Sequence, residues 1–397
     1  MIVGIDASNL RGGGGLTHLV GILRAASLPM HGVAQVAVWG PRATLNLLPP
    51  KPWLSLLHDP LLEGPLAART YWQRRILPKS AATSCDILFA PGGSVSRTIH
   101  PSVVMCRNML PFELREARRF GLSWTLARHV ALRFVQAQSF AHADGVIFLT
   151  RYAKGCVRSA VPSLGATDTA VIPHGIDEAS LSVPRSQFCI SDYSDARPFR
   201  LLYVSRISPY KHQVRVMRAV SELRSRGTPV VIEFVGGHDT DRALRAFENA
   251  RRDLDGKEQF VTSRGELSHS DTLSRYRDAD AFVYASSCEN MPNILLEAMA
   301  SGLPIACADR GPMPEILGPT GFYFDPLSVR SIVASLDEMV VSPVRRAQVA
   351  RSAFERSHQY SWTKCADETF RYLADVRRRV LAGAARGGPR LPAVTDY

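Results

Sequence analysis

The chain has 397 residues, 46% of them hydrophobic and 21% charged, which is typical of globular proteins and excludes collagen-like or broadly disordered chains. The length predicts two domains of about 200 residues or fewer each, because a single core would be too large. No run of about 18 apolar residues is present, so we expect no membrane-spanning helix. The residues after Met1 lack the basic and apolar regions of a signal peptide, so we expect a cytoplasmic protein.

The cysteines and the charge narrow the class of protein further. Seven cysteines, none in a Cys-x-x-Cys pair, favour reduced core thiols over disulfides or a zinc site. The net charge is +12, and most of the excess lies in residues 1–190, which carry 19 basic and 10 acidic residues. Such a surface attracts nucleic acid, anionic membrane or phosphorylated substrates, although a merely solvated arginine-rich surface is an equal alternative.

Short apolar segments alternate with helical patterns through both halves of the chain. They lack clean polar alternation, which is typical of strands buried on both faces of parallel sheets. Candidate strands lie at residues 2–6, 34–38, 86–90, 103–106, 146–149 and 170–172, and then at 201–204, 230–235, 260–262, 281–284, 305–308 and 321–324. The predicted fold class is α/β, with two doubly wound, Rossmann-like units.

A polar stretch without helical periodicity, near residues 186–199, indicates an interdomain linker. We expect an N-terminal domain over residues 1–188 and a C-terminal domain over residues 196–360. The Gly- and Pro-containing tail over residues 381–397 is expected to be disordered.

Four consecutive glycines at positions 12 to 15 separate the first predicted strand from a helical pattern. Such glycines let the backbone approach a ligand closely, and the free amides at a helix start favour an anion. The dinucleotide-binding pattern is incomplete, because Thr17 stands where a small residue is needed and the second strand ends without Asp or Glu. The loop therefore disfavours NAD and predicts either an anion site or a simple packing loop.

The strongest local signal is the pair Glu289 and Glu297, which are separated by seven residues. Glu289 lies in a loop after a predicted strand, and Pro292 fits the first position of a helix that Gly302 ends. Both carboxylates are expected at the carboxyl edge of the second sheet, where parallel sheets bind ligands. Amides of the first helical turn can hold a phosphate there, while the two carboxylates hold sugar hydroxyls.

Two cations, Arg206 and Lys211, lie in the loop after the first strand of the second half. On a departing diphosphate they would neutralise charge that grows in the transition state, which is worth about 2.7–4 kcal/mol per donor. The alternative is a pair of ordinary surface cations. The neighbouring His212 is interpreted as polar surface.

Together these segments resemble the family 4 retaining glycosyltransferases. The resemblance covers residues 1 to about 375 and rests on the glycine loop, the two cations, the two glutamates, Pro173-His174-Gly175-Ile176-Asp177 and Tyr360-Ser361-Trp362. It implies the two-domain GT-B fold, with a nucleotide sugar in the cleft between the domains. It also implies a final helix, about residues 362–380, that returns to the first domain.

The resemblance further implies roles for single residues. Arg206 and Lys211 would bind the diphosphate, Glu297 would bind the ribose, and Glu289 would meet the sugar. Donor contacts are also implied for Gly14, Gly15, Gly236, Arg264, Gly265, Asn290, Met291 and Asn293.

Two positions depart from the family pattern. Asn290-Met291 stands where many members have Gly-Phe, which could alter the sugar pocket. Asn108 occupies the place of a histidine near the reacting centre, and an amide cannot serve as a base near neutral pH. Arg107 or Glu113 could compensate for the missing histidine.

The expected function is retaining hexosyl transfer from a nucleoside-diphosphate sugar to a saccharide or lipid-linked saccharide, in bacterial cell-surface polysaccharide or glycolipid synthesis. No metal site is expected, and the donor is the only expected nucleotide. One alternative is another GT-B enzyme, such as a sugar phosphorylase or a nucleotide-sugar epimerase. A nucleic-acid-binding protein and an inactive scaffold are further alternatives, and neither is favoured by the motifs.

Arginines are mixed with aromatic and aliphatic residues over residues 112–140. Such a segment can lie on an anionic bilayer, which would make the protein peripheral on the inner face of the membrane. The alternative is a pair of core helices with a basic outer face.

Overall fold

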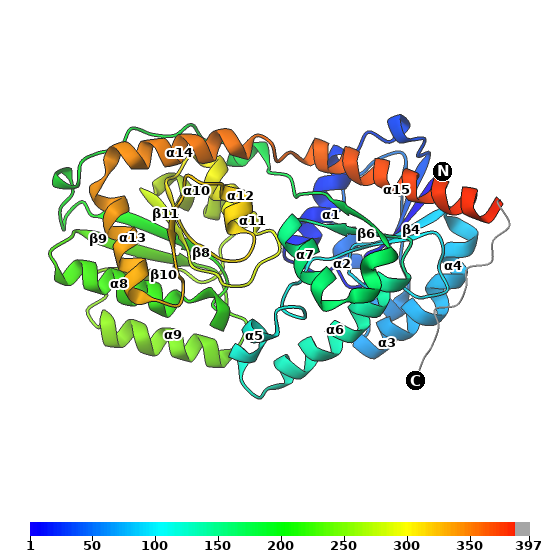
Figure 1. Ribbon diagram of the computed structural model, residues 1–397, viewed down its shortest axis with the longest axis horizontal. Helices are drawn as coiled ribbons and strands as arrows, with labels where there is room; N and C mark the ends of the chain where they lie inside the picture. The colour runs from blue at the N-terminus through cyan, green and yellow to red at the C-terminus, as the bar shows by residue number, and fades with distance from the viewer. Residues whose placement is uncertain (386–397) are drawn as a thin grey trace.

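The computed structural model describes residues 1–385 of the chain. Two sheets form its centre, with strand orders β3-β2-β1-β4-β5-β6-β7 and β10-β9-β8-β11-β12-β13, and helices cover both (Figure 1). Every pairing between neighbouring strands is parallel. The prediction of two Rossmann-like α/β units is confirmed.

The first sheet contains one strand that the sequence did not predict. Its strands are β1 (Ile2–Asp6), β2 (Gln35–Trp39), β3 (Leu54–Leu57), β4 (Ile87–Ala90), β5 (Ser102–Met105), β6 (Gly145–Phe148) and β7 (Asp168–Val171). The missed strand, β3, lies at the edge of the sheet and is only partly buried. Its short apolar run just after Pro52 therefore lacks the signature of a strand buried on both faces.

The second sheet agrees with the predicted strands to within two residues at either end. Its strands are β8 (Phe199–Val204), β9 (Val230–Val235), β10 (Val261–Ser263), β11 (Ala281–Tyr284), β12 (Ile305–Ala308) and β13 (Phe322–Phe324). Residues 186–199 lie against this unit, because buried Arg346 donates to Gln187 Oε1 at 3.0 Å and the Tyr193 ring packs on Phe199.

The helices alternate with the strands, as a doubly wound fold requires. Around the first sheet lie α1 (Gly14–Ala25), α2 (Arg42–Leu45), α3 (Leu66–Tyr71), α4 (Leu77–Ser84), α5 (Leu114–Ala117), α6 (Trp124–His142) and α7 (Arg151–Ala160). Around the second lie α8 (Gln213–Ser225), α9 (Asp241–Leu254), α10 (His269–Asp278), α11 (Asn293–Ala300), α12 (Met313–Leu317), α13 (Val329–Val341) and α14 (Pro343–Ser357).

The last helix, α15 (Trp362–Ala385), crosses back from the second unit and packs on α1 (Figure 1). A Cβ at Gly21 of α1 would overlap the Trp362 ring, so this close crossing needs a glycine. Residues 381–385, which were expected to be disordered, continue the helix. The rest of the expected disordered tail, residues 386–397, lies outside the described residues.

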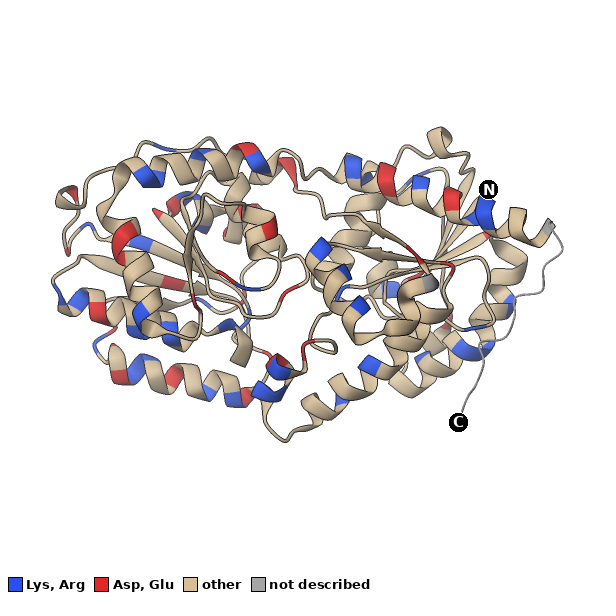
Figure 2. Ribbon diagram, viewed as in Figure 1, with Lys and Arg blue, Asp and Glu red and all other residues tan. Residues whose placement is uncertain are grey.

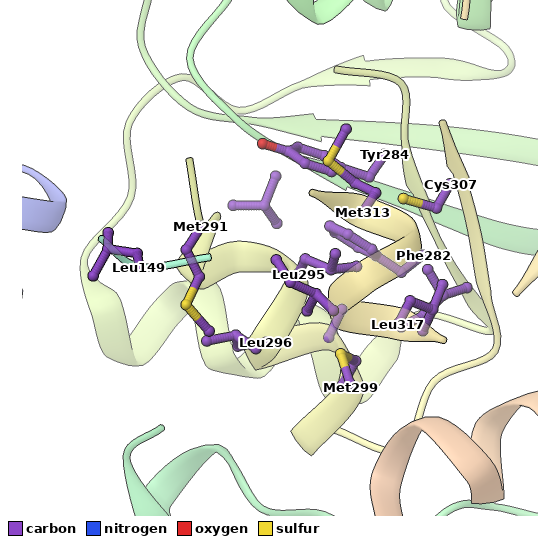
Figure 3. Close-up of a cluster of buried hydrophobic side chains, with 14 of the residues drawn as sticks. Leu149, Phe282, Tyr284, Met291, Leu295, Leu296, Met299, Cys307, Met313 and Leu317 are labelled. Atoms are coloured by element: carbon purple, nitrogen blue, oxygen red, sulfur yellow. The ribbon is translucent and has the colours of Figure 1, made fainter. Parts of the chain in front are cut away.

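The loop before α11 is held by an apolar core that reaches both units. Leu295, Leu296 and Met299 of α11 pack with Phe282 of β11, and Leu149, which follows β6, belongs to the same cluster (Figure 3). The functional loop is thus positioned by close-packed side chains on either side. No helix within residues 1–385 is long and apolar enough to cross a membrane.

Candidate active site

Lys211 and Glu289 form a largely buried ion pair at the carboxyl edge of the second sheet. Lys211 Nζ donates to Glu289 Oε1, and the two side chains are 9% and 15% exposed. Glu289 Oε1 also accepts from Tyr284 Oη and from Ser286 Oγ, both at 2.6 Å. Burial, and then the charge of Glu289, raises the pKa of Tyr284, so this hydroxyl stays a neutral donor. Three donors converge on one carboxylate oxygen and fix its direction.

The other glutamate, Glu297, lies on α11. Its Oε2 accepts from Tyr276 Oη at 3.3 Å. Burial raises the pKa of Glu297, against the lowering effects of His269 and of the Tyr276 hydrogen bond. Helix α11 begins at Asn293, so Pro292 is the residue before the helix, not its first residue as predicted. Gly302 follows the helix with a φ of 66°, as the helix-ending role requires.

The loop between Glu289 and α11 is anchored on the first unit. Asn290 Nδ2 donates to Cys106 O at 2.8 Å, and Met291 Sδ accepts from His174 N at 3.2 Å. Thr150 Oγ1 donates to Asn290 O at 3.2 Å. The side chains of Asn290 and Met291 therefore form contacts between the units. Any contact of these two residues with a nucleotide-sugar donor would be made by their backbone.

Arg206 has different partners from Lys211. Its Nε donates to Asp239 Oδ1 at 2.8 Å, and its Nη1 is 4.0 Å from Glu266 Oε2. The side chain is 54% exposed. The structure thus pairs Lys211 with Glu289 and holds Arg206 near the loop after β9.

The glycines at the end of the second sheet adjoin Arg206. Gly236 N donates to Gly265 O at 2.7 Å, and a Cβ at Gly236, whose φ is 140°, would overlap the Ser205 carbonyl. Arg264 is turned to Glu233, with Nε at 2.6 Å from Oε1. Gly236 is thus closely packed, whereas a Cβ at Gly265 would meet nothing within 4 Å.

The glycine loop faces a buried cation. Helix α1 begins at Gly14, and a Cβ at Gly15 would overlap the guanidinium of Arg107, which follows β5. Arg107 Nη1 is buried without a hydrogen-bond partner, and burial lowers the pKa of Arg107 to about 10. Asn293 Nδ2 lies 3.7 Å from the place of a Cβ at Gly14, and Asn293 Oδ1 is also buried without a partner. Unsatisfied polar groups from both units therefore converge on this loop.

Two buried histidines lie behind Arg107. His18 Nδ1 is 2.8 Å from His174 Nδ1. Burial lowers the pKa of both, His174 to about 3, and the Arg107 charge adds to the effect. Both rings are therefore neutral at pH 7, and they support the cation without adding charge. The sequence marked His174 by its motif, whereas His18 sits on a helix face without any local signal.

Asn108, expected near the reacting centre, makes a local contact. Its Oδ1 accepts from Leu110 N at 3.1 Å, which closes a turn after β5. Its neighbour Glu113 is a partly buried carboxyl whose Oε1 has no hydrogen-bond partner. Burial raises the pKa of Glu113 to about 7, and the charges of Glu116 and Glu289 add to the rise.

We expect Glu113→Gln to flatten the dependence of stability on pH. The ordinary pKa is 4.5, so between pH 4.5 and 7 the folded protein keeps a proton that the unfolded chain releases. Stability from the neutral carboxyl is present below pH 4.5 and is lost as the pH rises through 7. Urea unfolding at pH 5 and pH 8 should show a loss on the order of 2 kcal/mol in the wild type and little in the variant. The exposed Glu178→Gln should behave like the wild type, and parallel pH profiles of all three proteins would contradict this assignment.

His212 is not surface, as the sequence suggested, but buried in a chain of hydrogen bonds. It has a left-handed φ of 53° and accepts from Arg215 Nη1 at 2.7 Å through Nδ1. Its Nε2 lies 2.8 Å from Ser287 Oγ, which donates to Glu116 on α5. Burial lowers the pKa of His212 to about 3, so the ring is neutral. This chain ties the Lys211 loop to the first unit.

Comparisons with known proteins agree with the fold and the motifs. Residues 193–356 match the family described as glycosyl transferases group 1. An O-antigen chain mannosyltransferase of Escherichia coli is 26% identical over 42% of this chain and 44% of its own length. A sulfoquinovosyl transferase of Arabidopsis thaliana is 32% identical over 27% of this chain and 22% of its own length. The chain thus spans less than half the length of these relatives.

Two solved structures resemble the whole chain. A sucrose-phosphate synthase from Thermosynechococcus elongatus has a TM-score of 0.71 and 17% identity, over 96% of this chain and 100% of that one. Anabaena HepE in complex with UDP-glucose has a TM-score of 0.64 and 17% identity, over 97% of this chain and 100% of that one. At this identity the likeness shows the fold alone.

Proposed function

We propose that this chain, which has the GT-B fold and matches the glycosyl transferases group 1 family over residues 193–356, transfers a sugar from a nucleoside-diphosphate sugar to a saccharide or lipid-linked saccharide. The observation that carries this proposal is the buried Lys211–Glu289 pair beside α11, with Arg107 and the glycine loop from the other unit. Cations and helix amides from both sides can enclose a diphosphate there. HepE, a structural relative, is recorded with UDP-glucose, which supports the same class of donor.

In the proposed mechanism, the protein lowers the barrier mainly by neutralising the charge of the leaving diphosphate. Lys211 and Arg206 bind the diphosphate, and the first turn of α11 contributes its amides. Glu289 accepts hydrogen bonds from sugar hydroxyls, because Lys211, Tyr284 and Ser286 hold its Oε1 in place. Arg107 adds a cation from the first unit at Gly15. Each donor aimed at the leaving diphosphate would lower the barrier by about 2.7–4 kcal/mol.

The proposed reaction retains the configuration of the sugar and uses no metal ion. The bond to the diphosphate breaks through an oxocarbenium-like state, and a phosphate oxygen takes the acceptor proton on the same face. Asn108, committed to its turn, then has no need to act as a base. Glu297, turned to Tyr276, is proposed to bind the ribose, with the backbone at Gly236 and Gly265 beside the base.

The acceptor is proposed to be lipid-linked, with the protein cytoplasmic and peripheral on the membrane in polysaccharide or glycolipid synthesis. The segment with mixed arginines and apolar residues is divided: Phe112, Phe120 and Phe140 are buried. Leu122, Trp124 and Phe134 are instead 103%, 83% and 65% exposed. Exposed large apolar side chains beside arginines favour contact with an anionic bilayer.

Nucleotide binding tests the proposed donor. A thermal-shift screen with UDP, GDP, ADP, CMP and NAD should give a rise in Tm with one nucleoside diphosphate, in EDTA as well as in Mg²⁺. Ligand at 100 times Kd stabilises by about 2.7 kcal/mol. Arg206→Ala should abolish the rise, while the substitution of an exposed arginine on α13, Arg330→Ala, should keep it.

Two outcomes would contradict this function. The first is a shift with NAD only, or none with any nucleotide. The second is turnover of a sugar that requires inorganic phosphate in place of an acceptor, which would indicate a phosphorylase. Nuclear magnetic resonance of the new anomeric centre would test retention directly.

A further inference from the structure

A cavity of about 500 Å³ adjoins the site described above, where residues 119–125 of the first unit, at the start of α6, meet α8 and α9 of the second. Figure 1 shows α5 beside one end of α9, with α6 rising to the right of them. Both units contribute to its wall. Figure 2 shows Lys and Arg segments gathered at this junction.

Four arginines line this cavity: Arg119, Arg215, Arg218 and Arg242. Arg119 is paired with Glu116 at 2.6 Å. Within the described part of the chain, the other three form no ion pair. Arg215 donates to the neutral His212 ring at 2.7 Å, and Arg242 reaches across to the turn at Gly121, 2.9 Å from the place of a Cβ. The cavity therefore carries an excess of positive charge.

Three other polar side chains of the wall form hydrogen bonds within the protein. Ser123 caps α6 by accepting from Leu126 N, and Thr240 caps α9 by accepting from Ala243 N. Gln213 Nε2 donates to Arg206 O at 2.9 Å. Ser208 Oγ, also on the wall, is buried without a hydrogen-bond partner and can donate to an anion beside the guanidinium groups.

The rest of the wall is apolar. Phe120 from the first unit faces Ile207 and Phe247 from the second, and Ala243 and Ala246 of α9 complete this side. The exposed Leu122 and Trp124 alternate in sequence with Ser123 and Thr125, which line the cavity, so apolar surface continues outside it. A small hydrophilic anion would leave this apolar wall unused.

We propose that this cavity binds a long-chain phosphate: a phosphate or diphosphate monoester whose anionic group meets Arg215, Arg218 and Arg242 and whose chain lies on Phe120, Ile207 and Phe247. The inference deepens the proposed function, since it gives a lipid-linked acceptor a place for its phosphate and the first part of its chain. His212 lines the cavity and follows Lys211, so an occupied cavity adjoins the proposed transfer site.

Calorimetry with octyl phosphate, below its micelle concentration, tests the site without any turnover. Octyl phosphate should bind at least tenfold more tightly than butyl phosphate, because each buried methylene group increases the affinity about fourfold. Inorganic phosphate and 1-octanol should each bind at least tenfold more weakly than octyl phosphate. Arg218→Ala/Arg242→Ala should weaken the binding of octyl phosphate at least tenfold.

Two further variants sharpen the test. Arg245→Ala/Arg252→Ala removes the same charge from α9 away from the cavity and should leave the affinity unchanged. Ala246→Trp, which fills the cavity and keeps every arginine, should weaken binding of octyl phosphate. Equal affinity for phosphate and octyl phosphate would overturn the proposal, as would equal effects of the two double variants.

Vesicles separate the two sources of such a ligand. Cosedimentation with phosphatidic acid vesicles that is lost in Arg218→Ala/Arg242→Ala would assign a bilayer lipid. Binding of octyl phosphate without this cosedimentation would assign a long-chain phosphate outside the bilayer. Nucleoside diphosphate binding is measured on the same samples, so failure of this site and failure of the proposed transferase are distinguishable.

Discussion

Lys211→Met should lower kcat/KM by about 10²–10³ and destabilise the fold by about 3 kcal/mol. The loss of activity follows from the loss of one donor to the leaving diphosphate. The loss of stability follows from the burial of Glu289, whose carboxyl group would lose its cationic partner. We expect the low end of the 3–5 kcal/mol range, because Tyr284 and Ser286 still donate to Glu289 Oε1. Steady-state kinetics and urea unfolding measure the two effects.

The double variant Lys211→Met/Glu289→Gln separates these two roles. Removing the carboxylate charge should restore most of the stability, since no unpaired charge is then buried. It should not restore activity, because the cation is still missing. Lys257→Met, an exposed lysine of the same unit, should change neither quantity. Recovery of activity in the double variant would mean that Lys211 acts only as a structural partner.

The sequence located Lys211 and Glu289 separately but did not predict their contact. Glu289 was placed at the carboxyl edge of the second sheet, and Lys211 in a loop after a strand. The hydroxyls of Tyr284 and Ser286, which fix the carboxylate, belong to a strand and loop that read as simple core. Their contact depends on side-chain packing, which local spacing does not encode. Arg206 illustrates the same limit, because its turn toward Asp239 depends on how the neighbouring loop folds.

Contacts between residues on distant strands were harder still to predict from the sequence. Gly15 and Arg107 lie far apart in sequence and meet because the sheet order sets β4 between β1 and β5. His212 directly precedes the 13 residues of α8. The helical pattern of α8 did not predict that His212 is buried with a left-handed backbone conformation. Periodicity predicts which face of a helix is apolar, but not which polar residue is enclosed when two units close on each other.

Gly15→Ala should reduce kcat/KM by about 10²-fold while costing roughly 1–3 kcal/mol of stability. The new Cβ would overlap the Arg107 guanidinium, which must move from its buried position. A displacement of about 1 Å in a charged group at a transfer site is enough to cost such a factor in rate. Kinetics at saturating acceptor and thermal unfolding of the purified variant give both numbers.

The glycine loop supplies its own control for this experiment. Gly12→Ala adds the same methyl group where nothing lies within 4 Å, and it should leave activity and stability close to those of the wild type. Arg107→Ala should lose activity to a similar extent as Gly15→Ala, and the combination of the two should be no worse than Arg107→Ala alone, because both act through one group. If Gly15→Ala behaved like Gly12→Ala, Arg107 would have no part in transfer. The loop would then serve only to pack α1 against the end of β5.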